Sequence, residues 1–293
     1  MMKKVPGTSP LQHSQKLWKT QVFHKSAGIP TGEVPGTFSV AAIVPAAGDG
    51  TRIGAPVSKL FLPLGGQPLL AHALRVLQAH PAIRWIVLVV READRAAARA
   101  LLARHRVTKA LPPCLGGASR AESVAKGFAA VPPQAAWVLV HDGARPCVSR
   151  RLIDDALRAA RRQGAVACGL PASLTVKAVD ERRQVRLTLD RSSLWMAQTP
   201  QVFRRDWFAQ ALARACLSPS GDGRQADHQL SHFPDDVAIL EAAGFPVAMV
   251  SGDRLNLKVT TKDDLLLAEA ILRSRASGKM AKWQRARGMH VAT

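Results

Sequence analysis

Tyrosine is absent from this 293-residue sequence, and aromatic residues of every kind make up only 5% of it. Proteins that bind single-stranded nucleic acid stack bases on aromatic side chains that alternate with basic ones. The scarcity of aromatic residues and the lack of an RNA-module signature therefore argue against a specific nucleic-acid partner. The formal net charge of +20 still attracts polyanions, so a non-catalytic nucleic-acid-binding protein is kept as a minor alternative.

Long apolar runs are absent as well. No segment approaches the roughly 20 apolar residues that a bilayer-spanning helix requires. The opening residues, MMKKVP, lead into polar sequence and not into the apolar core of a secretory signal. We therefore expect a cytoplasmic protein with no membrane partner.

Cysteine is equally scarce. The residues are widely spaced, form no C-x-x-C pair and stand at Cys114, Cys147, Cys168 and Cys216. This spacing supports neither a structural zinc site nor a disulfide framework, so we expect reduced thiols.

Acidic residues are nearly missing from both ends of the chain. Five lysines and a single acid, Glu33, precede Phe38, and six basic residues with no acid follow from Arg273 onward. We interpret residues 1–37 as a flexible basic extension and residues 277–293 as a basic tail. Residues 38–276 form the predicted folded domain between them.

Within that domain, continuous apolar segments of strand length alternate with amphipathic helical segments. Strands are predicted at residues 40–44, 85–90, 137–141, 165–170 and 247–250, and helices at 68–79, 94–104, 119–130, 151–162 and 262–272. Asp94 and Ser119 are the expected helix N-caps, and Glu122 completes a capping box with Ser119. This order predicts a doubly wound, mostly parallel α/β sheet, whose ligands bind at the carboxyl ends of the strands.

The alternation changes over residues 171–191. Residues 173–179 and 184–189 alternate apolar and polar side chains around a turn at 180–183, a pattern that predicts a projecting β-hairpin. A hairpin without a neighbouring strand is marginally stable, so we expect this arm to pack on a partner subunit. Residues 217–233 are polar and predict a surface loop.

Three clusters of glycine and charged residues follow predicted strands. The first is AAGDGTR at residues 46–52, with Lys59 shortly after it. Small residues let the backbone N–H groups approach an anion, and a nearby arginine and lysine can contact phosphate oxygens. The spacing matches neither a Walker A loop nor G-x-G-x-x-G, and an ordinary glycine-rich turn is the simpler alternative.

The other two clusters are GGASRAES at residues 116–123 and HDGARP at residues 141–146. Two glycines before a helix leave N–H groups that suit a ribose, a base edge or a phosphate, or that merely cap the helix. Asp142 ends a predicted strand, where it can hold a divalent cation or a ribose hydroxyl. The alternative for Asp142 is a loop salt bridge with Arg145.

Taken together, these clusters resemble the 2-C-methyl-D-erythritol 4-phosphate cytidylyltransferase family of the non-mevalonate isoprenoid pathway. The likeness runs from about Val40 to Leu272 and rests on five motifs in the same order: PAAGDGTRIGAPVSKLFLPLGGQPLL, GGASRAESV, VLVHDGARP, LDRSSLWMAQTPQVF and LNLKVTTKDDLLLAE. It implies a Rossmann-like homodimeric nucleotidyltransferase. Such an enzyme uses CTP and Mg²⁺ to convert 2-C-methyl-D-erythritol 4-phosphate into 4-diphosphocytidyl-2-C-methyl-D-erythritol and pyrophosphate.

The resemblance also implies a role for each group of site residues. The cytidine pocket would be lined by Pro45, Ala46, Ala47, Gly48, Gly116, Gly117 and Ser123. Arg52, Lys59 and Lys258 are the expected catalytic residues, because cations there stabilise charge developing at the α-phosphorus. Asp142 would lie near the metal or the ribose, with Arg145 supporting it. A phosphate monoester is already an anion at neutral pH, so no general base is expected.

The acceptor side of the resemblance is less complete. Thr175 and Arg191 in the arm, together with Lys258, would hold the methylerythritol phosphate across the subunit boundary. Leu174 stands where the family commonly has Asp, and Pro234 stands where it has Thr. A cytidylyltransferase for ribitol 5-phosphate or another polyol phosphate is therefore the nearest alternative.

Overall fold

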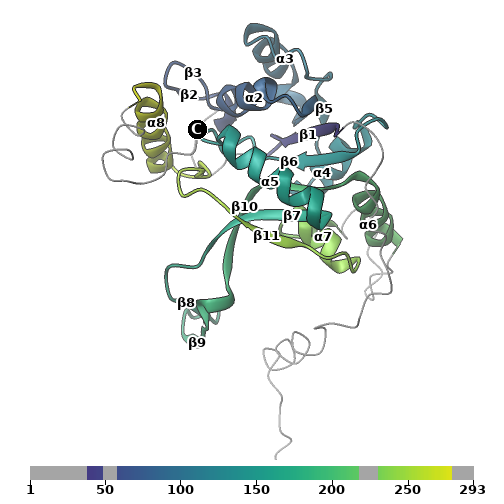
Figure 1. Ribbon diagram of the computed structural model, residues 1–293. Helices are drawn as coiled ribbons and strands as arrows, with labels where there is room; N and C mark the ends of the chain where they lie inside the picture. The colour runs from purple at the N-terminus through teal and green to yellow at the C-terminus, as the bar shows by residue number, and fades with distance from the viewer. Residues whose placement is uncertain (1–37, 49–57, 218–229, 279–293) are drawn as a thin grey trace, which may run out of the picture. The chain divides into compact units, whose positions relative to one another are not determined.

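A seven-stranded sheet forms the centre of the chain in the computed structural model, which describes residues 38–48, 58–217 and 230–278 (Figure 1). From one edge to the other, its strands are β11 (Ala248–Ser251), β7 (Ala165–Pro171), β10 (Trp195–Arg204), β6 (Trp137–Val140), β1 (Val40–Pro45), β4 (Ile83–Val90) and β5 (Cys114–Leu115). The strands predicted from apolar runs are therefore all present, with boundaries shifted by one or two residues.

The sheet is parallel except at one strand. β1 pairs in parallel with β4 and β6, β4 with β5, and β7 with β11. β10 runs antiparallel between β6 and β7. The mostly parallel α/β prediction is confirmed, but β10 was not predicted. It carries the polar residues Gln198, Thr199 and Gln201, which are buried against other segments.

Helices cover both faces of this sheet. The helices are α2 (Leu69–Ala79), α3 (Arg95–Arg104), α4 (Arg120–Ala129), α5 (Arg150–Gln163), α6 (Arg205–Leu217), α7 (Asp236–Ala242) and α8 (Lys262–Ala276). Val40, Ala42 and Val44 of β1 belong to a core cluster that includes residues of α2 and α5. On the opposite face, a Cβ added to Gly127 of α4 would meet Ile43, because the helix backbone lies close to the strand there. Successive side chains of a strand point to opposite faces, so the apolar residues of both faces need helices to cover them, and the sheet is doubly wound.

Two predicted helix starts show how local geometry decides a cap. The Ser119 hydroxyl accepts from the Glu122 N–H at 3.1 Å, as expected. The Glu122 carboxylate accepts from the Ala118 N–H at 2.8 Å and not from that of Ser119, so the capping box is half formed. Asp94 stands at the N-cap position of α3, as predicted, but its side chain makes no cap hydrogen bond. A 3-10 turn, η3 (Glu92–Asp94), already places Asp94 in helical backbone, and its carboxylate accepts from Arg91 Nε at 2.6 Å.

The predicted hairpin is formed by β8 (Val176–Val179) and β9 (Val185–Leu189), which make a two-stranded sheet of their own (Figure 1). Val179 and Val185 are register partners, and their exposed fractions are 53% and 58%. A 3-10 turn, η4 (Arg191–Ser193), follows the hairpin and leads into β10. One antiparallel strand therefore connects the hairpin to the middle of the sheet.

Smaller elements complete the described chain. They are the paired strands β2 (Pro63–Leu64) and β3 (Gln67–Pro68) and the 3-10 turns η2 (Lys59–Phe61) and η6 (Leu230–His232). Within the described ranges, no helix combines the length and apolarity that a membrane crossing needs. Arg52, most of the 217–233 loop, the predicted basic extension at residues 1–37 and residues 279–293 of the predicted basic tail lie outside the described residues.

Candidate active site

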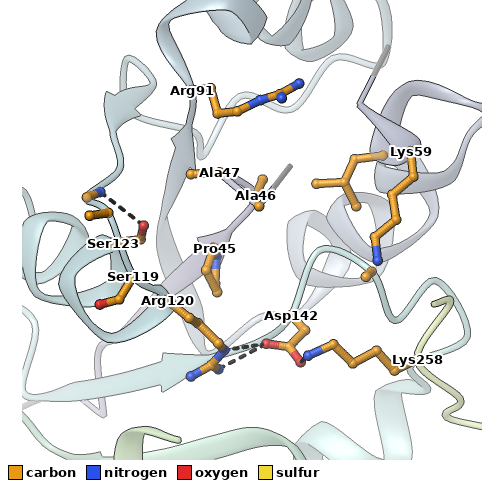
Figure 2. Close-up of a pocket in the computed structure, with 15 residues that line it drawn as sticks. Pro45, Ala46, Ala47, Lys59, Arg91, Ser119, Arg120, Ser123, Asp142 and Lys258 are labelled. Carbon is orange, nitrogen blue, oxygen red and sulfur yellow. Dashed lines mark hydrogen bonds and ion pairs between the residues drawn. The ribbon is translucent and has the colours of Figure 1, made fainter. Parts of the chain in front are cut away.

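A pocket of about 570 Å³ opens where β1, β4 and β6 end, at the carboxyl edge of the parallel strands. Pockets of this size accommodate small-molecule ligands such as nucleotides. The described residues that line it are Pro45, Ala46, Ala47, Gly48, Lys59, Leu60, Arg91, Gly117, Ala118, Ser119, Arg120, Ser123, Asp142, Ala144 and Lys258. The predicted location at the strand ends is thus where the cavity lies (Figure 2).

The end of β1 supplies a small-residue wall. The Ala46 N–H donates to the Val89 carbonyl at 2.7 Å, which keeps the chain in line with the sheet as it enters the pocket. No atom of the described residues lies within 4 Å of where a Cβ of Gly48 would stand, so this part of the chain leaves room for ligand atoms to approach the backbone there. Lys59, on η2, faces this wall, and its Nζ donates to the Val259 carbonyl at 2.9 Å.

The start of α4 forms a second wall. Gly117 lines the pocket, and its N–H donates to Ser123 Oγ at 3.1 Å. Gly116 does not line the pocket but packs directly behind it. A Cβ at Gly116 would collide with the Cβ of Ala47 and lie 2.8 Å from Ser123 Oγ. Glycine is required here because the two walls touch through this position.

Asp142 follows β6 and is surrounded by cations. Arg120 Nε and Nη2 donate to Asp142 Oδ1 at 3.0 and 2.9 Å, and Lys258 Nζ lies 2.8 Å from Oδ2. Figure 2 shows Arg120 and Lys258 reaching this carboxylate from opposite sides. Arg145 Nε is more distant, at 3.6 Å from Oδ2. The alternative of a simple Asp142–Arg145 loop salt bridge therefore describes the weakest of three contacts.

These charges decide the ionisation of the loop. Burial alone would raise the pKa of Asp142, but Arg120 and Lys258 outweigh it and hold that pKa well below its ordinary range. Neighbouring His141 is fully buried, and burial lowers its pKa to about 4. Its ring nitrogens lie 3.1 Å from the Arg145 carbonyl oxygen and 3.2 Å from Thr199 Oγ1. At neutral pH the loop holds an ionised aspartate beside a neutral histidine.

Lys258 is carried by a segment fixed to the same loop. Arg145 Nη1 donates to the Asn256 carbonyl at 2.8 Å, and the Val259 N–H donates to the Ala144 carbonyl at 2.8 Å. Arg145 does not line the pocket, because its guanidinium lies behind Asp142 and joins the two segments. Arg145 is therefore placed to support Asp142 and Lys258, and it is not placed to contact a ligand.

The pocket brings together nine of the predicted site residues. They are Pro45, Ala46, Ala47, Gly48, Lys59, Gly117, Ser123, Asp142 and Lys258. Thr175 and Arg191 lie in the hairpin and are not among the residues that line the pocket of their own chain. Arg191 Nη1 instead donates to the Ser173 carbonyl at 2.6 Å, which ties the base of the hairpin together. Arg52 lies outside the described residues.

Two pocket cations were not predicted. Arg91 follows β4 directly, so the strand-end rule that selected Asp142 applies to it equally. Arg120 is the first residue of α4, where the helix dipole disfavours a positive charge. The helices α3, α5, α6 and α8 also begin with a basic residue, so this position alone gave no signal in the sequence that Arg120 belongs to the site.

The described residues contain no group of three or more His, Cys, Asp and Glu side chains placed to hold a metal ion. Asp142 is the only carboxylate among the described residues that line the pocket. No histidine or cysteine lines this part of the pocket either, so it has no nucleophile–base pair of the usual kind. The site is built to bind a polyanion and to stabilise negative charge.

A doubly wound sheet with glycine backbone, cations and one carboxylate at its strand ends defines a binding site for a nucleotide or another phosphorylated ligand. Comparison with protein families matches residues 40–274 to IspD, 2-C-methyl-D-erythritol 4-phosphate cytidylyltransferase. The chain belongs to this family.

Individual relatives agree with the assignment. The chain is 40% identical over 233 residues to the 2-C-methyl-D-erythritol 4-phosphate cytidylyltransferase of a Synechococcus species, a match that covers 80% of this chain and 96% of the relative. It is 36% identical over 238 residues to that of Desulforamulus reducens, covering 81% and 97%. Among solved structures, the 4-diphosphocytidyl-2C-methyl-D-erythritol synthase of Anaerococcus prevotii has a TM-score of 0.67 at 28% identity, covering 80% of this chain and 96% of that one.

Proposed function

We propose that this chain transfers the cytidylyl group of CTP to 2-C-methyl-D-erythritol 4-phosphate, giving 4-diphosphocytidyl-2-C-methyl-D-erythritol and pyrophosphate. The observation that carries the proposal is the pairing of Lys258 with Asp142 at 2.8 Å in a pocket that Lys59 also lines. Two cations and one ionised carboxylate at the end of a parallel sheet suit a nucleoside triphosphate with its counter-ion. Family membership gives this triphosphate and its acceptor their identities.

The reaction requires positioning more than proton transfer. An oxygen of the acceptor phosphate attacks the α-phosphorus of CTP, and the bond from that phosphorus to the bridging oxygen of the β-phosphate breaks. The electron pair leaves with pyrophosphate. Lys59 and Lys258 stabilise the charge that develops on the phosphoryl oxygens, in a site where glycine backbone holds the nucleotide. We assign the cytidine contacts to Pro45–Gly48, Gly117 and Ser123, which Gly116 supports from behind.

Asp142 suits the metal that nucleotide chemistry commonly requires. Mg²⁺ is often held by one or two carboxylates together with substrate phosphates. Asp142 is ionised at neutral pH and lines the pocket, so it can supply the protein's share of such a site. Mg²⁺ bound to Asp142 and the triphosphate would neutralise charge on the phosphates.

The acceptor contacts require a second copy of the chain in this proposal. Thr175 and Arg191 do not line the pocket of their own chain, and they lie on or beside a hairpin with an exposed apolar pair. A homodimer that exchanges hairpins would bring both residues to the partner's pocket. The exposed side chain of Leu174 would then lie near the acceptor.

Pyrophosphate release tests the proposal directly. Purified full-length chain is supplied with CTP, Mg²⁺ and either 2-C-methyl-D-erythritol 4-phosphate or ribitol 5-phosphate. We expect release with the first acceptor alone. Release with ribitol 5-phosphate alone would keep the chemistry and overturn the acceptor, and no release with either would overturn the assignment of the pocket.

A further inference from the structure

A second carboxylate stands behind Arg120, outside the pocket. Asp236 is the first residue of α7 and is 0% exposed. Arg120 Nη1 donates to its Oδ1 at 3.0 Å, and Arg120 Nη2 donates to its Oδ2 at 2.9 Å. This two-point contact fixes the plane of the guanidinium as well as its position.

The same guanidinium also holds Asp142. An arginine side chain has five N–H donors, and four hydrogen bonds from Arg120 to the two carboxylates are present. Both bonds to Asp142 go to Oδ1, which leaves Oδ2 facing Lys258. By holding one oxygen, the guanidinium fixes the orientation of the Asp142 carboxylate and leaves its other oxygen for the lysine.

Asp236 is itself held by neighbouring polar groups. The N–H groups of Asp236 and Val237 donate to Gln201 Oε1 at 3.0 and 3.1 Å. Gln201 Nε2 donates in turn to Asp235 Oδ2 at 2.9 Å, and Asp235 Oδ1 caps α7 by accepting from the Ala238 N–H. A chain of hydrogen bonds therefore runs from β10 through α7 and Arg120 to the pocket.

We propose that Asp236 is a positioning residue, which acts through Arg120 to set the orientation of Asp142 and thereby the place of Lys258. This inference rests on the proposed function. Asp236 does not line the pocket, so it cannot act by touching a ligand there. A buried carboxylate paired only for stability would not need to share its arginine with the pocket aspartate. The sharing is what makes the pair part of the site.

The location of Pro234 follows from the same network. Pro234 was assigned to the acceptor side from the sequence, but Asp236 pairs with Arg120, which also holds Asp142, and Asp235 accepts from Gln201. The departure from threonine at Pro234 therefore falls next to the residues that orient Asp142, and not next to the hairpin.

Asp236→Asn tests the proposal, because it keeps the volume of the side chain and removes its charge. We expect kcat for pyrophosphate release to fall about 100-fold, while the Kd for CTP with Mg²⁺, measured by calorimetry, changes less than about threefold. Asp236→Glu, which retains the carboxylate, is expected to recover most of the lost kcat. The matched control is Asp206→Asn, since Arg204 binds Asp206 at two points on the exposed surface.

A double variant separates positioning from folding. Arg120→Met with Asp236→Leu removes both members of the pair, so no unpaired charge stays buried behind the pocket, and Asp142 keeps Lys258 and Arg145 as partners. Because Arg120 lines the pocket, its loss slows the reaction on either interpretation, and this variant reports only whether the fold survives without the pair. A thermal unfolding midpoint near that of wild type would show that the kcat lost in Asp236→Asn is not lost through unfolding. If the wild-type chain turns over and the kcat of Asp236→Asn lies within about threefold of the wild-type value, the inference about Asp236 is overturned while the proposed function stands. Absence of turnover in the wild type would overturn the proposed function as well.

Discussion

Lys258 Nζ lies 2.8 Å from Asp142 Oδ2, on the side of the carboxylate opposite to Arg120. Because Arg120 keeps Asp142 paired by itself, removal of the Lys258 charge leaves no isolated buried carboxylate. We therefore expect Lys258→Met to fold normally but to lower kcat about 100- to 1,000-fold, the usual cost of losing one group that stabilises transition-state charge. Pyrophosphate release and thermal unfolding together measure both effects.

Lys262→Met is the matched control for Lys258, because Lys262 is exposed at the start of α8 and does not line the pocket. It should leave both activity and stability unchanged. If Lys258→Met lost stability in proportion to activity, Lys258 would be a structural partner of Asp142 and not a phosphate contact.

Two glycines of the pocket should respond differently to the same change. Gly116→Ala places a methyl group against Ala47 and Ser123, so we expect a loss of about 1–3 kcal/mol in unfolding free energy and a KM for CTP raised about tenfold. Among the described residues, no atom lies within 4 Å of a Cβ added at Gly48. Gly48→Ala should therefore keep wild-type stability while the KM for CTP rises. Equal stability losses in both variants would contradict this distinction.

Stability should fall as pH decreases from about 6.5 to 4. His141 takes up a proton near its ordinary pKa of about 6.5 when unfolded, but burial lowers its folded pKa to about 4. The unfolded state thus binds more protons in this window, and the fold loses about 3 kcal/mol across it. Burial lowers the pKa of His72 and His80 also, which adds to the same trend.

Urea unfolding at several pH values measures this dependence. His141→Gln removes the His141 contribution, so its stability should vary less between pH 6.5 and 4 than that of the wild type. His232→Gln is the control, because His232 is exposed and should leave the pH dependence as it is. A wild-type slope retained in His141→Gln would show that His141 is not the group responsible.

The hairpin should control the oligomeric state. Val179 and Val185 face each other across β8 and β9 and are both exposed in the single chain. In the proposed dimer, glutamate at both positions would place two charges in the buried interface, so we expect this variant to be a monomer by sedimentation velocity. Activity should fall as well, because Thr175 and Arg191 would no longer reach the partner's pocket. Arg182→Glu, in the exposed turn, should remain a dimer.

The parts of the molecule that the sequence predicted share a physical cause. β1, β4 and β6 are buried on both faces, so each reads as a continuous apolar run, and the pocket forms where such runs end. The residues that line the pocket at these strand ends could therefore be placed before the structure was known. Motif resemblance, and not periodicity, supplied their individual roles.

The parts that were missed depend on distant partners. β10 contains buried Gln198, Thr199 and Gln201, whose hydrogen-bond partners include Asp253, His141 and Asp235. In the sequence alone, a segment with three such polar residues resembles a surface loop, because their hydrogen-bond partners lie far away along the chain. Arg120 and Asp236 are likewise 116 residues apart in sequence, a separation that no local pattern can bridge.

The separation of Thr175 and Arg191 from the pocket of their own chain has a genetic consequence. If hairpins are exchanged, each active site takes its lysines from one chain and its arm from the other. Two defective alleles, one carrying Lys59→Ala and the other Arg191→Ala, would then complement each other when expressed together. In every mixed dimer one site receives both lesions and is dead, while the other receives neither and is whole.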